Sequence, residues 1–67
     1  MLHLDAEDIA IDVAISTRDI ARAWWNYAGT RIPIVPGHEL VRIDTPDGKA
    51  FHVAIIVTPL AARKDTK

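Results

Sequence analysis

The residue types that most often carry catalysis are few in this chain and stand apart from one another. Ser16 is the only serine, there is no cysteine, and no G-x-S-x-G motif surrounds Ser16. A nucleophilic hydroxyl needs a neighbouring base, whereas a serine just before a helix-forming run commonly caps that helix. We therefore expect Ser16 to cap a helix, and we expect the protein not to be an enzyme.

Three histidines and an acidic cluster are the candidate metal ligands. His3, His38 and His52 lack the close sequence pairing that zinc sites usually contain. The acidic residues near the start of the chain lack the spacing and the glycine of a calcium loop. These residues are Asp5, Glu7, Asp8 and Asp12. The glycines are isolated, so no phosphate-binding loop is predicted either, and we expect no metal site and no cofactor.

Recognition of another protein is the function that the remaining residues favour. A helix over residues 17–28 places Arg18, Arg22 and Trp25 on one stripe, with Asn26 beside it. Tryptophan and arginine are the residue types most enriched among interface hot spots. These four residues are the predicted partner-binding site. In the alternative interpretation, Trp25 packs at the boundary of the core and contacts an arginine through its ring.

A second, smaller surface is predicted on a hairpin in the second half of the chain. The segments 39–45 and 50–58 flank Thr45-Pro46-Asp47-Gly48, a sequence typical of a turn. Pairing Thr45 with Lys49 places apolar side chains opposite each other on one face, Ile43 with Phe51 and Val41 with Val53. Arg42 and His52 then face each other on the other side of the hairpin and form the possible secondary surface.

The first half of the chain must supply the elements that position these residues. Apolar and polar side chains alternate over residues 8–15, which predicts a strand, although alanines at positions 6, 10 and 14 leave a helix as the alternative. A helix is predicted over 17–28, capped by Ser16 and ended by Gly29. Its predicted core face is Ile20, Ala23, Trp24, Tyr27 and Ala28.

The segments that follow complete the predicted sheet. Residues 31–37 contain two prolines, which restricts them to an edge strand or a crossing loop. Residues 55–57 are apolar on both faces, which predicts that the second hairpin strand is central. The predicted fold is therefore a small α+β domain in the order β-α-β-β, with a three-stranded, mostly antiparallel sheet and one helix on one face.

Length and composition set the class of protein. The chain has 67 residues, 49% of them hydrophobic, and a net charge of −1, which predicts one globular domain over 1–58 and a basic, flexible tail over 59–67. The sequence has no span of about 20 apolar residues and begins without a basic signal segment, so we expect a cytoplasmic protein. A small core without disulfides predicts a homodimer, the alternative being a monomer whose proline-rich segment covers one sheet edge.

Three functions fit these features. The first is a protein-binding module, of the accessory inhibitor or adaptor type found in phages and plasmids, that covers the surface of a partner protein. The second is a nucleic-acid-binding regulator: if residues 6–15 are helical, a helix-turn-helix followed by a hairpin resembles a winged helix, and residues 17–28 read the bases. The third is a structural subunit that acts only in assembly.

Overall fold

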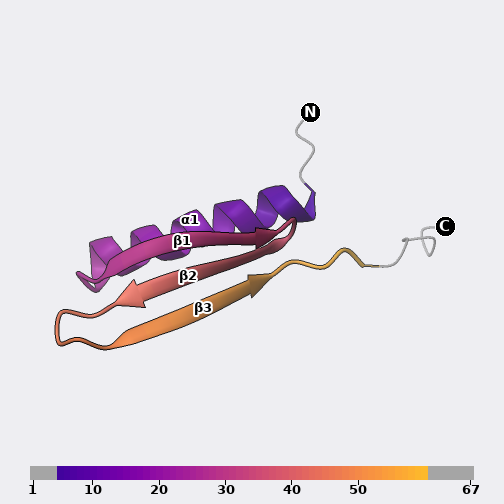
Figure 1. Ribbon diagram of the computed structural model, residues 1–67. Helices are drawn as coiled ribbons and strands as arrows, with labels where there is room; N and C mark the ends of the chain where they lie inside the picture. The colour runs from indigo at the N-terminus through magenta and orange to yellow at the C-terminus, as the bar shows by residue number, and fades with distance from the viewer. Residues whose placement is uncertain (1–4, 61–67) are drawn as a thin grey trace.

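The computed structural model describes residues 5–60 and shows one helix packed on one face of a three-stranded antiparallel sheet (Figure 1). The elements are α1 (Ala6–Trp24), β1 (Ala28–Val35), β2 (His38–Asp44) and β3 (Ala50–Ile56). The strands lie in the order β1-β2-β3. This arrangement confirms the predicted α+β class, the three-stranded sheet and the single helix. Residues 61–67, which contain most of the predicted tail, lie outside the described residues.

The strand predicted over residues 8–15 is wrong, because these residues form the first half of α1. The alanines decide the outcome: Ala10, Ala14 and Ala21 are completely buried against the sheet. Their small side chains let the helix approach the strands closely, and the isoleucines and valines between them lie on its flanks. The helix continues to Trp24 without interruption, so the chain has no helix-turn-helix in this region.

The helix begins and ends at residues other than the predicted ones. Asp5 is the N-cap: its Oδ1 accepts a hydrogen bond from the amide of Asp8 at 3.0 Å, and Oδ2 of Asp8 accepts one from the amide of Asp5 at 3.4 Å. This reciprocal pair is a capping box. Ser16 therefore lies within the helix and does not cap it. At the other end Asn26, with φ of 58°, reverses the chain where Gly29 was expected to do so.

The hairpin agrees with the prediction residue by residue. Ile43 pairs with Phe51, Val41 with Val53 and Arg42 with His52. In the turn, the amide of Thr45 donates to the carbonyl of Lys49 at 2.9 Å and the amide of Gly48 donates to the carbonyl of Thr45 at 3.1 Å. Gly48 has a φ of 91°, a conformation that an L-residue adopts only at a cost.

The order of the strands corrects one expectation and confirms another. β1 contains Pro33 and lies at one edge of the sheet, as its prolines predict. β3 lies at the other edge and β2 is central, so the expectation that apolar residues 55–57 mark a central strand is wrong. Those residues are apolar without being covered: Ile56 is exposed and Ile55 is only partly buried.

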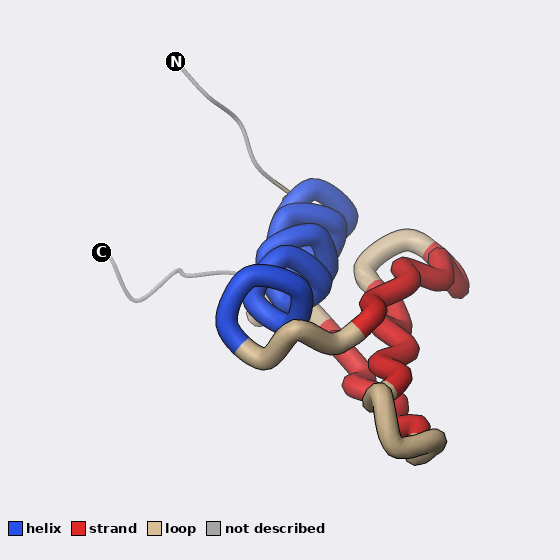
Figure 2. Tube along the Cα trace, turned by 90° about the vertical axis from the view of Figure 1, so that its left-hand side faces the viewer, coloured by secondary structure: helices blue, strands red, loops and turns tan. Residues whose placement is uncertain are grey.

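The core is small and lies between α1 and β2. Its buried cluster consists of two helix residues and two β2 residues, with Tyr27 and Ile55 packed against it. The cluster residues are Ala14, Ala21, Val41 and Ile43. Of the predicted helix core face only Tyr27 packs on this cluster, whereas Ile20 and Trp24 are exposed. Figure 2 shows the helix on one side of the strands, with the sheet extending beyond it.

Candidate functional site

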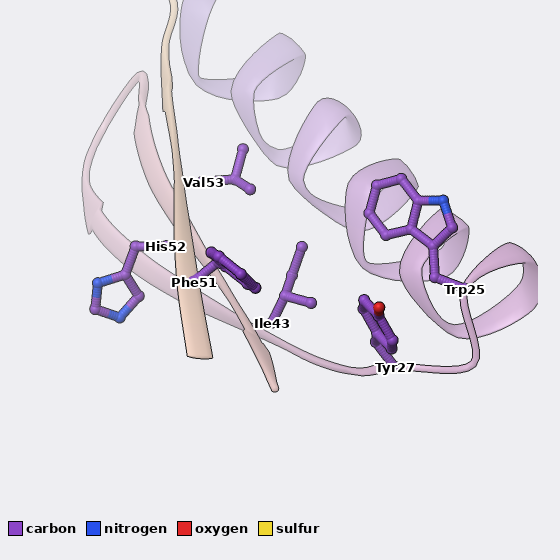
Figure 3. Close-up of a pocket in the computed structure, with 6 residues that line it drawn as sticks. All are labelled: Trp25, Tyr27, Ile43, Phe51, His52 and Val53. Carbon is purple, nitrogen blue, oxygen red and sulfur yellow. The ribbon is translucent and has the colours of Figure 1, made fainter. Parts of the chain in front are cut away.

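An apolar groove runs between the C-terminal end of α1 and the inner face of β3 (Figure 3). The helix packs mainly over β1 and β2 and makes few contacts with β3, so Phe51 and Val53, which point toward the helix layer, stay partly uncovered. Phe51 is 54% exposed and Val53 is 36% exposed. The groove has a volume of about 520 Å³ and is lined by Trp25, Tyr27, Ile43, Phe51, His52 and Val53.

The lining is apolar except at its rim. In Figure 3, Phe51, Val53 and Ile43 lie between the strands and the helix, while His52 points away to the other side of β3. Trp25 and Tyr27 form the end of the groove where the helix stops, with ring centroids 6.1 Å apart and planes tilted by 55°. Trp25 is 52% exposed, which leaves a large part of its indole ring available for contact.

One flank of the helix extends this apolar surface along its length. Residues three and four apart lie on the same side of a helix, and four exposed apolar residues have this spacing: Ile9, Val13, Ile20 and Trp24. The opposite flank, with Arg18 and Arg22, lies against β1, so these four side chains lie on the flank toward β3. We call these four residues the helix flank.

The structure separates the residues of the predicted partner-binding stripe. Nη2 of Arg22 donates a hydrogen bond to the carbonyl oxygen of Gly29 at 2.9 Å, so this side chain is tied to β1. Arg18 pairs with Asp19 at 3.2 Å and passes so close to Gly29 that a Cβ there would lie 2.9 Å from its Cγ. Gly29 is therefore required for the close approach of helix and strand. Trp25 alone of the stripe lines the groove, next to exposed Asn26.

The predicted secondary surface lies on the outer face of the sheet, where His52 borders the groove and directs its ring away from it. Arg42 and His52 are directly opposite each other in the register of β2 and β3. Nε of Arg42 donates to Oδ1 of Asp44 at 3.0 Å. This hydrogen bond and the charge of Asp44 raise the pKa of Arg42 above its ordinary value. The guanidinium is thus already paired within the sheet.

One ion pair beneath the helix was not predicted. The guanidinium of Arg31 on β1 binds the carboxylate of Glu39 on β2 through both Nε and Nη2, and the residue Glu39 is only 5% exposed. The hydrogen bond to Glu39 raises the pKa of Arg31. The sequence contained a signal, because Arg31 and Glu39 fall at inward-facing positions of adjacent strands once β1 is placed beside β2. The pair lines a hollow between the strands and the N-terminal half of α1, together with Glu7 and Ile11 of the helix.

Comparison with known protein families, curated proteins and solved structures found no match. The site must therefore be interpreted from its own chemistry.

Among residues 5–60 no cluster of histidine and acidic side chains could hold a metal ion. No helix in this part of the chain is both long and apolar enough to cross a membrane. His3 lies outside the described residues.

The arrangement of the groove suits contact with an apolar surface. Its lining residues are mostly aromatic and aliphatic, and their polar groups are the indole N–H of Trp25, the phenol of Tyr27 and the imidazole of His52, which points away from the groove. Such side chains supply binding free energy through burial, at about 25 cal/mol for each Å² of apolar surface removed from water. Exposed contiguous apolar surface of this kind commonly marks an interaction site.

Proposed function

We propose that this chain is a protein-binding module without enzymatic activity, which receives an apolar segment of another protein in the groove between α1 and β3. The observation that carries the proposal is the β3 side of the sheet, where Phe51 and Val53 point toward the helix layer and remain partly exposed. The proposal keeps the predicted function class and moves the binding site from the arginine stripe to the groove. It places the module in the cytoplasm, as the sequence predicts.

The size of the uncovered area favours a helix as the bound segment. An α-helix with its side chains is about 10–12 Å wide, whereas neighbouring strands are about 4.8 Å apart. One helix therefore covers about two strands, and α1 covers β1 and β2. A second helix placed beside α1 would cover β3 and contact the helix flank at the same time, in the way amphipathic helices bind hydrophobic grooves.

The charge of α1 defines the chemistry of that partner helix further. Asp12 and Asp19 lie on the solvent-facing side of α1, next to the helix flank. Asp19 is paired with Arg18, whereas the acidic first half of the helix has no basic residue of its own. The complementary partner is an amphipathic helix whose apolar face enters the groove and whose lysines or arginines lie along the side next to α1.

Selective loss of binding in matched variants tests this function. The wild-type protein and the variants Trp25→Ser and Phe51→Ser are used to capture proteins from cells that make the chain, with nuclease-treated and untreated samples in parallel. Ile34→Ser is the control, because Ile34 is 52% exposed, like Trp25, but lies on β1. We expect a protein that survives nuclease treatment, is retained by Ile34→Ser and is lost from both groove variants.

Three results would contradict the proposal. Capture that both groove variants retain would show that the groove is not the binding site. Capture that disappears with the nucleic acid would favour the regulator, and recovery of the chain alone would favour the assembly subunit. A protein captured through the groove must also contain an amphipathic helix with basic residues beside its apolar face. This is checked with a synthetic peptide of that helix and a variant peptide in which the basic residues are replaced by glutamate.

A further inference from the structure

One edge of the sheet is protected against pairing with another strand and the other edge is not. This difference points to a second interaction surface. In antiparallel strands the backbone groups of alternate residues point to opposite sides. The amides of Thr45 and Val57 donate to the carbonyls of Lys49 and Gly37, which fixes this alternation. On β1 the outward-facing residues are consequently Gly29, Arg31 and Pro33. On β3 the outward-facing residues are Ala50, His52, Ala54 and Ile56.

The free edge of β1 is blocked against pairing with another strand. The carbonyl of Gly29 accepts the hydrogen bond from Arg22, and Pro33 has no backbone N–H to offer. The register shifts between Pro33 and Val35, which marks an irregularity at the end of the strand. Proline, a charged side chain over the edge and a bulge are devices by which natural proteins prevent edge-to-edge association.

The free edge of β3 carries none of these devices. Its sequence, from Ala50 to Ile56, contains no proline, lysine, arginine or acidic residue, and its register with β2 is regular throughout. Every outward-facing residue can both donate and accept a backbone hydrogen bond. In Figure 1 no other helix or strand of residues 5–60 lies beside β3 on its outer side. An unprotected edge of this length is a template for strand pairing.

We propose that two copies of this chain pair antiparallel along β3, forming a six-stranded sheet with both helices on the same face. A second copy is favoured over a foreign strand because β3 has no full charge, so two identical strands bring no like charges together. The two-fold axis passes midway between Val53, the middle residue of the strand, and Val53 of the second copy. His52 then pairs with Ala54 of the second copy, and Ala50 with Ile56 of the second copy.

This register also joins the apolar surfaces of the two copies. Val53 meets Val53 of the second copy at a non-hydrogen-bonded position, where side chains are closest, and Phe51 lies opposite Ile55 of the second copy. The two grooves merge into one trough between the helices, two strands or about 10 Å wide. The role of the trough rests on the proposed function, in which the trough would hold one partner helix. The pairing of the two β3 strands does not depend on a partner.

The contact is small, and its expected strength follows from its size. Stable interfaces usually bury about 1,200–2,000 Å² in total, whereas a seven-residue edge is only about 23 Å long. We therefore expect a dimer that dissociates on dilution and that a helix bound in the trough would strengthen. The oligomeric state of the purified chain is accordingly measured across a wide range of concentrations.

Disulfide trapping tests both the pairing and its register, because the natural chain has no cysteine. In the proposed dimer the Cα atoms at position 53 are about 4.5 Å apart, within the range of a disulfide. We expect Val53→Cys to form a covalent dimer on mild oxidation. Phe51→Cys is the control: Phe51 is more exposed than Val53, 54% against 36%, but its copies lie four residues out of register, about 13 Å apart.

Sedimentation equilibrium of the unmodified chain supplies the measurement that does not depend on oxidation. We expect a monomer–dimer equilibrium that Ala54→Pro shifts fully to monomer, because this proline removes an N–H from the free edge and none from the ladder with β2. A chain that is monomeric up to about 1 mM, a dissociation constant worth only about 4 kcal/mol, overturns the proposal. So does faster trapping at position 51 than at 53. No partner protein is present in either experiment, so failure of the dimer is distinguishable from failure of the proposed function.

Discussion

Two valines that pair across β2 and β3 allow a test of whether α1 covers β2 more completely than β3. Val41 on β2 and Val53 on β3 are register partners and point to the same face. Val41 is completely buried beneath the helix, whereas Val53 is 36% exposed at the groove. The same substitution, valine to alanine, therefore removes the same atoms from two different environments.

The expected losses follow from burial. Removing two methyl groups from a buried valine costs about 1.6 kcal/mol in transfer free energy, at about 0.8 kcal/mol for each group, before the cavity adds its own cost. We expect Val41→Ala to lower the free energy of unfolding by about 2–3 kcal/mol. Val53→Ala leaves no closed cavity and removes groups that are already partly in water, so we expect about 1 kcal/mol or less.

Urea denaturation followed by circular dichroism measures both values. The experiment is made at low concentration, where the proposed dimer is dissociated, and the milder Ile43→Val replaces Val41→Ala if that variant is already partly unfolded. Equal losses at positions 41 and 53 under these conditions would refute the reasoning, because they would mean that β3 is as well covered as β2. At high concentration the loss at Val53 should increase, since the second copy then buries it.

Three further changes test local features of the fold. Replacing Gly29 with alanine should lower the melting temperature, because its Cβ would lie 2.9 Å from Cγ of Arg18, and Gly29→Ala combined with Arg18→Ala should recover part of the loss. The hydrogen bond from the amide of Asp8 holds the pKa of Asp5 below its ordinary value of 3.8. The stability that this cap adds is present above pH 3.8 and is lost as the pH falls through the lower pKa of the folded state. The free energies of unfolding of wild type and Asp5→Ala, measured as a function of pH, should therefore converge in acid. Arg22→Met frees the carbonyl of Gly29, and light scattering should show more association than in wild type.

The hairpin could be predicted from the sequence because its determinants are local. Pro46 and Gly48 favour one turn, the turn sets the register, and the register places Val41 opposite Val53 and Ile43 opposite Phe51. Each step follows from the turn, whose residues are neighbours in the sequence. The β1 edge was predictable for a similar reason, since a proline can occupy only certain places in a sheet.

The first half of the helix could not be decided in the same way. Its isoleucines and valines have strand preference and alternate with period two, while the alanines that actually contact the sheet are small and carry little signal. An alanine at a helix–sheet contact stabilises the fold by letting the helix lie close to the strands, and this effect is visible only in the packed structure. The capping box of Asp5 and Asp8 was the local signal that favoured the helix.

The candidate site was only partly accessible from the sequence, because it depends on what α1 fails to cover. Trp25 was correctly singled out and lines the groove. Arg18 and Arg22, its neighbours on the helical wheel, are directed to β1 instead. The exposure of Phe51 follows from the position of the helix over β1 and β2, a tertiary fact that the pattern of the hairpin does not contain.

One helix is too narrow to cover all three strands of the sheet. Three strands span about 14 Å across the sheet, and a single helix covers only about 10 Å of that width. A strand left uncovered is usually polar on its exposed face. β3 instead presents Phe51 and Val53, both partly exposed, on the inner face and Ile56 beside the open edge, where their exposed apolar surface lowers solubility. Apolar residues at these positions are understandable when a second element covers them, and the unblocked edge of β3 adjoins the same surface.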